Sequence, residues 1–180
     1  MTEIVNVVAA GKLGRELDVQ TVAEDINAGV VKLSDETYSN RVVYLRREEG
    51  GPMVTLFRSG SYHVTGAKSA EEAEELKDWM VAMLRELGIE ATATFAIKNV
   101  VMTADLGERV NLNALVIGLG LEKTEYEPEQ FPGVVYRPPD IESVFLIFGS
   151  GKVVITGSPD VKTANEGFEA VTGRLKQIVG

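Results

Sequence analysis

The sequence repeats itself, and this duplication restricts what the chain can fold into more than any other feature. Residues 4–8 (IVNVV) return as residues 97–101 (IKNVV), and residues 57–60 (FRSG) return as residues 148–151 (FGSG). The offset between the halves is 93 residues for the first pair and 91 residues for the second. Because the offset is nearly constant, we infer one structural unit that is repeated head to tail.

The length and the apolar content suit a closed domain made of two pseudo-symmetric halves. The chain has 180 residues, of which 44% are hydrophobic, so a sizeable core can form. Two copies are too few for a solenoid, and we place the repeats at residues 1–91 and 92–180. No apolar run approaches the roughly 20 residues of a membrane-spanning helix, and the N-terminus lacks a secretory layout, so we expect an intracellular protein.

The residue types argue against an enzyme, a metal site or a cofactor. The chain has no cysteine and one histidine, which excludes thiolate sites and disfavours a His-based metal cluster or a serine-type triad. Asp105 and Glu108 lie close in sequence, but no nucleophile–base pair accompanies them. We therefore expect no catalysis, no metal and no cofactor.

The formal net charge of −9 argues against a nucleic-acid ligand. Affinity for phosphate comes largely from Lys and Arg, so an acidic chain is not an obvious DNA-binding protein. The acidity is equally typical of a high-salt cytoplasm or of an acidic surface that a partner recognises. The motifs must outweigh this charge before DNA can be proposed.

Each half is predicted to contain a strand, a helix, three or four further strands and a long closing helix. The first helices begin after N-cap residues Asp18 and Asn111, and Ser69 with Glu72 forms a capping box at the closing helix of the first half. The expected strands are 3–9, 29–33, 41–47, 52–58 and 61–66 in the first half, and 94–102, 133–137, 143–149 and 151–156 in the second.

Two such halves side by side predict an α+β fold. Its two tandem repeats would form one curved antiparallel sheet with the helices packed on one face. Strand alternation would leave the other face open and too apolar for bulk water, which usually marks a binding surface. The residues expected there are Asn6, Val8, Thr55, Phe57, His63, Thr65, Asn99, Val101, Leu146, Phe148, Val154 and Thr156.

A longer motif in the second half accompanies these residues. Asn99-Val100-Val101 precedes residues 126–137 (YEPEQFPGVVYR) and residues 148–157 (FGSGKVVITG). The combination resembles the archaeal type of TATA-box-binding protein, and the resemblance covers the whole chain because both repeats match in order. It implies that the curved sheet is a saddle with the helices on its convex face. It also implies a general transcription initiation factor that binds and bends A/T-rich promoter DNA in the minor groove. TATA-box-binding proteins are themselves the standard example of this mechanism.

The resemblance also implies roles for individual residues. Asn6 and Asn99 would donate to adenine N3 and thymine O2, where the amino group of a G·C pair would clash. Phe57, Phe131 and Phe148 would wedge between base steps and kink the duplex. The other DNA contacts would come from Val8, Tyr38, His63, Thr65, Lys68, Val101, Arg137, Leu146, Val154 and Thr156.

The first half departs from the family pattern where the second has its Phe-Pro-Gly motif. An offset of 93 residues places Tyr38 at the position of Phe131, where it is either a replacement wedge or an ordinary loop aromatic. Leu45 falls near the position of Arg137. We expect weaker, salt-sensitive or altered sequence recognition by this half.

Two further substitutions change polarity in the first half. Thr55 replaces Leu146, and His63 replaces Val154. His63 either donates a hydrogen bond in a minor groove or is a solvent-facing strand histidine.

The second-half loop implies a protein partner. In the family this loop docks transcription factor B, which here assigns Glu127, Glu129 and Gln130 to that contact, with RNA polymerase recruited indirectly. An acidic loop suits a basic partner, although a solvated loop tip would have the same composition.

A different class of function stays open at this point. A curved sheet gripped by helices also suits a small-molecule or protein-binding module that does not bend DNA. Such a module needs one deep cavity, whereas the predicted open face repeats its residues in a two-fold register. This repetition favours a long pseudo-symmetric ligand such as duplex DNA.

Overall fold

The structure is a computed structural model that describes residues 2–34 and 41–179. The chain divides into two compact units. One comprises Asn6–Lys98, and the other joins the residues up to Val5 with those from Asn99 onward. The boundary between repeats that the sequence places at residues 91 and 92 stays a prediction.

The first half contains five antiparallel strands in the order β2-β3-β4-β5-β1. Their register is continuous from β2 to β5, and the pairing of β5 with β1 is interrupted by one bulge. The elements are β1 (Thr2–Lys12), α1 (Val19–Asp25), β2 (Val30–Leu33), β3 (Val42–Arg46), β4 (Met53–Phe57), β5 (Ser61–Ala67) and α2 (Ala70–Glu86).

The second half repeats this order as β6-β10-β9-β8-β7. Strand β7 is the one described strand that the sequence did not predict, because two residues are too short to show an alternating pattern. The elements are β6 (Ala96–Asp105), α3 (Leu112–Leu119), η2 (Leu121–Lys123), β7 (Thr124–Glu125), β8 (Gly133–Tyr136), β9 (Val144–Phe148), β10 (Lys152–Ser158) and α4 (Val161–Val179).

Helices α1, α2 and α3 begin where the sequence predicts. The Asp18 carboxylate accepts from the Thr21 backbone N–H, and the corresponding cap Asn111 accepts from Ala114. Ser69 accepts from the N–H of Glu72 at 3.0 Å, which begins α2. These side chains satisfy backbone donors that a helix leaves unpaired at its N-terminus.

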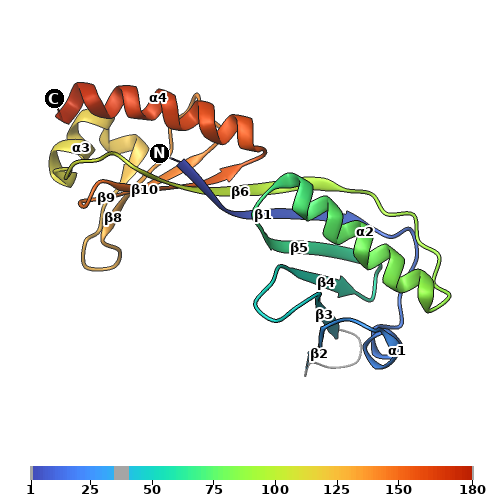
Figure 1. Cartoon of the computed structure of the whole chain (residues 1–180). Helices are drawn as coiled ribbons and strands as arrows, with labels where there is room; N and C mark the ends of the chain where they lie inside the picture. Colours follow the sequence, from blue (N-terminus) through green and yellow to red (C-terminus); the bar gives the residue numbers. More distant parts are fainter. Residues whose placement is uncertain (1, 35–40, 180) are drawn as a thin grey trace. The chain divides into compact units, whose positions relative to one another are not determined.

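Within each half the helices cover one face of the strands. In Figure 1, α2 (green) lies across β1, β5 and β4, and α4 (red) lies across the strands of its own half. The strand residues beneath them are buried: Tyr62 and Val64 in β5 and Ile155 in β10 are fully buried, and Val153 is 1% exposed. The predicted inward set is therefore confirmed, and the alternate residues lie on the face that none of the described helices covers.

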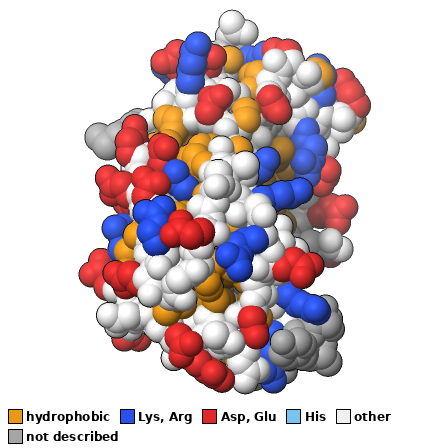
Figure 2. All heavy atoms as spheres, turned by 90° about the vertical axis from the view of Figure 1, so that its right-hand side faces the viewer, with side chains coloured by type: hydrophobic (Ala, Val, Ile, Leu, Met, Phe, Trp, Pro, Cys, Tyr) orange, Lys and Arg blue, Asp and Glu red, His pale blue; other side chains and the backbone are white. Residues whose placement is uncertain are grey.

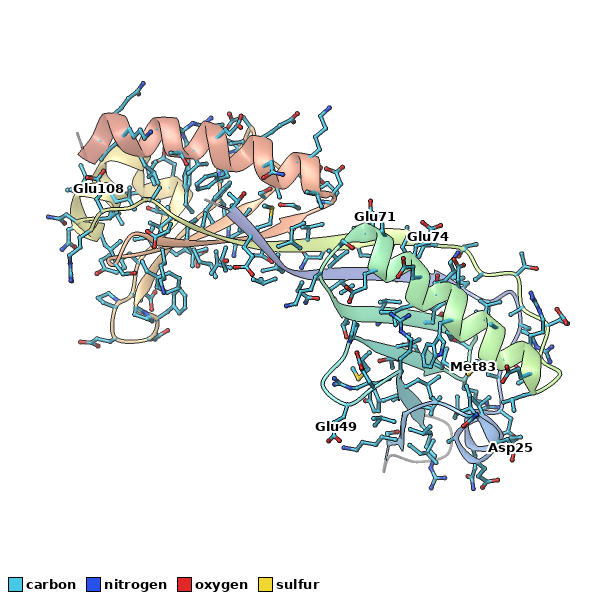
Figure 3. All side chains as sticks on the ribbon, in the orientation of Figure 1. Asp25, Glu49, Glu71, Glu74, Met83 and Glu108 are labelled. Atoms are coloured by element: carbon cyan, nitrogen blue, oxygen red, sulfur yellow. The ribbon has the colours of Figure 1, made fainter. Side chains whose placement is uncertain are left out.

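The acidic residues of α2 lie off its buried stripe. Ala73, Leu76 and Met80 are fully buried, whereas Glu71 and Glu74 are exposed. Figure 3 shows both glutamates pointing away from the strands. They form a solvated helical face, as the sequence pattern indicates.

A tight glycine turn joins the last two strands of each half. Gly60 has φ +89° and Gly151 has φ +95°, a region that favours glycine. A Cβ atom at Gly60 would lie 1.8 Å from the Arg15 carbonyl oxygen, and one at Gly151 would lie 2.1 Å from that of Glu108. Both turns therefore require glycine, which explains why this motif is repeated in the sequence.

No helix among the described residues is long and apolar enough to cross a membrane.

Candidate nucleic-acid interface

The open face of the first half carries a row of four side chains across the strands, and three of them are polar. His63 pairs with Ala10 on β1 and with Thr55 on β4, and Thr55 pairs in turn with Tyr44 on β3. His63 is exposed and Tyr44 is half-buried, while Thr55 is 8% exposed between them. We call these four residues the first-half row.

The open face of the second half carries an apolar row in the same register. Val154 pairs with Thr103 on β6 and with Leu146 on β9, and Leu146 pairs with Val135 on β8. Val154, Leu146 and Val135 are all half-buried. We call these four residues the second-half row. The strand register makes it the counterpart of the first-half row, residue for residue.

Two matched asparagines are held by backbone hydrogen bonds. The Asn6 Oδ1 atom accepts from the Gly66 N–H at 2.7 Å, and the Asn99 Oδ1 atom accepts from the Gly157 N–H at 2.8 Å. Only the carboxamide oxygen can accept from an N–H, so each Nδ2 group remains a donor. A long contact of 3.5 Å joins Asn99 Nδ2 to Thr156 Oγ1.

A β-bulge accompanies each asparagine. The register of β5 against β1 shifts between Val7 and Ala9, and that of β10 against β6 shifts between Ile155 and Ser158. The extra residue leaves a backbone N–H without a ladder partner, which the asparagine accepts. The two open-face asparagines are thus fixed in the same way in both halves.

Phe131 and Phe148 form an aromatic pair at one end of the second half. Their ring centroids lie 5.6 Å apart at an interplanar angle of 66°, an edge-to-face contact. Phe148 pairs across the strands with Gly133, where a Cβ atom would lie 3.1 Å from both rings. The absence of a side chain at Gly133 therefore makes room for the pair.

The corresponding place in the first half is built differently. Val42 pairs with Phe57 as Gly133 pairs with Phe148. The ring of Phe57 contacts His63 edge to face, with centroids 5.0 Å apart. Tyr38, the predicted replacement for the second ring, lies outside the described residues.

Strand register corrects the predicted counterpart of Arg137. Leu45 pairs with Val54 as Tyr136 pairs with Phe145, so Leu45 corresponds to Tyr136. Leu45 is fully buried and belongs to the core. The first-half counterpart of Arg137 is Arg46, because the offset in these strands is 91 residues.

The cations near the open face differ in how they are held. Arg137 lies 3.6 Å from Glu125, but both side chains are more than half exposed, so this pair contributes little. Arg46 donates to the Gly51 carbonyl oxygen at 2.7 Å. Arg58 and Lys68 are exposed. Figure 2 shows acidic and basic side chains interspersed on the face that it presents, with apolar side chains between them.

The second-half loop between β7 and β8 presents the predicted partner residues. Glu127, Glu129 and Gln130 are all exposed. The backbone N–H groups of Gln130 and Phe131 both donate to the Glu127 carbonyl oxygen at 2.9 Å. This turn places the acidic loop directly before the aromatic pair.

Each half has its own hollow beside β1 or β6. In the second half Thr103, Phe148, Lys152 and Val154 help to line a hollow of about 600 Å³. In the first half Ala10, Lys12, Ser61 and His63 help to line one of about 320 Å³. The hollows repeat with the fold, which differs from the single deep cavity that a small-molecule module needs.

Three open-face residues were not among the predicted contacts. Tyr44, Thr103 and Val135 all alternate with buried strand residues. The signal was present in the strand from residue 41 to 47, where the apolar Val43 should face inward and Tyr44 outward.

The repeated fold and its matched open-face residues define a two-repeat binding protein, and comparisons with known proteins name the class. The sequence model of the family described as transcription factor TFIID (or TATA-binding protein, TBP) matches residues 1–87 and 94–178. TATA-box-binding protein C of Halobacterium salinarum is 47% identical over 98% of both chains. The TATA-box-binding protein of Archaeoglobus fulgidus is 40% identical over 98% of this chain and 95% of its own.

A solved structure agrees with the sequence comparisons. The Methanococcus jannaschii TBP matches with a TM-score of 0.82 and 37% identity, and the match covers 99% of both chains. The chain belongs to the TATA-box-binding protein family, a family of transcription factors and not of enzymes. The predicted α+β fold with two tandem repeats is confirmed, with ten strands of antiparallel sheet and four α-helices among the described residues.

Proposed function

We propose that this chain is a general transcription initiation factor that binds A/T-rich promoter DNA in the minor groove, bends it, and recruits transcription factor B and, through it, RNA polymerase. It would act in the prokaryotic cytoplasm, associated with the nucleoid. The observation that carries this proposal is the edge-to-face pair of Phe131 and Phe148, two half-buried rings next to the open face of the second half. Its two repeats, residues 1–91 and 92–180, would each contact half of the site.

The matched asparagines supply the preference for A·T pairs. The minor groove of an A·T pair offers the acceptors adenine N3 and thymine O2. Asn6 and Asn99 present donors, because their oxygens are already engaged by Gly66 and Gly157. A G·C pair adds an amino group, which is a second donor and meets these amides unfavourably.

The aromatic rings supply the bend. A ring inserted between two base pairs partly unstacks them, and the cost is offset by the larger surface that the bent duplex buries. Phe131 and Phe148 support each other, since the rings are in contact and Gly133 leaves space for both. Phe57, whose ring contacts His63, would be the wedge of the first half.

Apolar contacts and a few cations supply affinity. Val8, Val101, Leu146, Val154 and the methyl groups of Thr65 and Thr156 would press on base edges and exclude water. Lys68 and Arg137 would contact phosphates, where each contact releases counterions and makes binding depend on salt. With a net charge of −9, the chain must rely more on apolar burial than a basic DNA-binding protein does.

The acidic loop supplies the protein contact. Glu127, Glu129 and Gln130 are exposed on a turn beside the aromatic pair, where a basic surface of transcription factor B could meet both the loop and the bent DNA. Complementary charge of this kind favours fast and specific association.

A bend measurement on duplex DNA tests the proposal. Fluorescence energy transfer across an end-labelled A/T-rich duplex should rise when the protein binds, at several salt concentrations. Phe148→Ala and Phe131→Ala should each reduce the bend, and the two changes together should cost less than their sum because the rings act as one unit. If the unmutated protein does not bend the duplex, or if the bend is the same in both variants as in the unmutated protein, the proposal is wrong.

A further inference from the structure

The two matched rows of the open face differ in hydrogen-bonding chemistry. Every pairing of the first-half row has its counterpart in the second-half row. His63, Thr55 and Tyr44 carry hydrogen-bonding groups, whereas Val154, Leu146 and Val135 do not. At the other end of the rows the difference is reversed, because Ala10 of the first half has no hydrogen-bonding group and Thr103 of the second half has a hydroxyl group.

His63 is the most accessible polar group of the first-half row. It is exposed, whereas Tyr44 is half-buried and Thr55 is 8% exposed. Its ring rests edge to face on Phe57 at 5.0 Å, which restricts the orientation of the imidazole. A neutral imidazole has one nitrogen that accepts a hydrogen bond.

An acceptor at this place changes which base pairs the row can face. The exocyclic amino group of guanine is the one donor that distinguishes a G·C pair in the minor groove. Against Val154 and Leu146 this donor would be buried without a partner, which is costly. Against His63 it can be satisfied.

We propose that His63 is a specificity-determining residue that lets the first half accept a G·C pair, while the second half requires an A·T pair. This inference rests on the proposed function. The guanine amino group donates to the imidazole nitrogen, with Tyr44 and Thr55 as further polar neighbours. The protein therefore recognises an asymmetric site and binds it in one orientation, with the first half over the G·C pair.

A set of three duplexes tests this. The first is an all-A/T site, the second has one G·C pair moved position by position through one half, and the third carries inosine–cytosine at the same positions. Inosine lacks the amino group.

The unmutated protein should bind the best-placed G·C site within about threefold of the all-A/T site. His63→Val should weaken binding to it on the order of tenfold, because one buried donor loses its partner. Inosine should restore that loss.

Orientation is measured separately, which the absence of cysteine makes simple. A DNA-cleaving reagent is attached to Glu108→Cys, an exposed position in the second half, or to Arg15→Cys, its first-half counterpart 93 residues earlier. On the G·C site the Arg15→Cys reagent should cut beside the G·C pair and the Glu108→Cys reagent at the other end. Val154→His should let either half accept G·C and mix the two patterns.

The outcomes separate this inference from the proposed function. If the protein neither binds nor bends the all-A/T duplex, the proposed function fails. If it binds and bends that duplex but His63→Val leaves the G·C penalty unchanged, or if the second half lies over the G·C pair, the inference alone is overturned.

Discussion

The carboxamide oxygen of Asn99 accepts a hydrogen bond of 2.8 Å from the backbone N–H of Gly157, and Asn6 makes the same bond to Gly66 at 2.7 Å. Each glycine has a positive φ angle, +74° at Gly157 and +84° at Gly66. The bond therefore fixes a turn in the strand that favours glycine, and it aims an amide donor at the open face. One interaction serves both the fold and the proposed recognition of DNA.

Asn99→Asp separates these two roles. The carboxylate still accepts from Gly157, so the free energy of unfolding should change little, but the donor is lost and a negative charge faces base acceptors. DNA affinity should fall by about 1–3 kcal/mol, the usual cost of a lost specific contact. Titration of a labelled duplex measures the affinity, and urea unfolding measures the stability. Asn99→Ala is the control and should lower both; an Asp variant that binds as well as the unmutated protein would contradict the role.

Gly133→Ala should disturb the aromatic pair. The new Cβ atom would lie 3.1 Å from the rings of both Phe131 and Phe148 and from the Ile147 carbonyl oxygen. We expect a loss of about 1–3 kcal/mol in stability from overpacking and a smaller DNA bend. Energy transfer across the duplex measures the bend. Val42→Ala at the first-half counterpart is the control, because it removes atoms and should leave the second-half ring pair unchanged. If both variants lose the same amount of DNA bend, the ring pair is not the source of the bend.

Arg137→Ala should reduce the salt dependence of DNA binding. If the guanidinium contacts one phosphate, the slope of log affinity against log salt should fall by roughly 0.9. The exposed ion pair with Glu125 does not oppose this, since such pairs are weak. Arg46→Ala makes the matched comparison in the first half. An unchanged slope with Arg137→Ala would show that this residue lies away from the phosphates.

Tyr62 should make stability fall in alkaline solution. Burial, the first cause, and the charges of Asp78 and Glu74 raise the pKa of Tyr62 from 10.0 to about 12. Since the folded pKa is the higher one, folding favours the neutral phenol. This stabilisation is complete below pH 10 and is lost as the pH rises through 12.

The free energy of unfolding measured against pH checks this prediction. Tyr62 also donates to the Thr94 carbonyl oxygen, so Tyr62→Phe should cost about 0.5–1.5 kcal/mol near neutral pH. The variant should then lose less stability than the unmutated protein between pH 10 and 12. Parallel curves would mean that Tyr62 does not titrate in this way.

Asp160 should make stability fall in acid. Hydrogen bonds from Thr163, first from its backbone N–H, lower the pKa of the Asp160 carboxyl below 3.8. The stabilisation is present above pH 3.8 and is lost as the pH falls through the lower folded value. Asp160→Ala should lower the melting temperature near neutral pH, and the difference should vanish in acid. Asp160→Asn keeps an acceptor that does not titrate, so its melting temperature should depend less on pH.

Periodicity predicted most of the fold, and short or irregular segments escaped it. The caps at Asp18 and Asn111 and the inward residues Tyr62 and Val64 follow from local rules that apply in any context. Strand β7 and the true counterpart of Arg137 do not, because they depend on which strand pairs with which. Register across strands is a tertiary property, and the sequence shows it only where the offset between halves is constant.

The candidate site was predicted mainly from the resemblance of the second-half motif to a known family, and less from the alternation of side chains along the strands. The alternation that placed Phe148 and His63 on the open face also applies to Tyr44, but no motif drew attention to it. The offset is 93 residues from Lys32 to Glu125 and 91 from Val42 to Gly133, so the halves differ in length just where Phe131 needs its counterpart. The assignment of Tyr38 therefore stays a prediction.

The helix-covered side of each strand and its uncovered side tolerate change to different degrees. Val64 and Ile155 are fully buried, so a change there would disturb the packing of a core, whereas His63 and Val154 are matched positions on the uncovered side and already differ between the two repeats. A duplicated unit of this kind can change the DNA preference of one repeat while the buried core stays the same. That freedom offers a simple route by which a cell with several such factors can assign them to different genes.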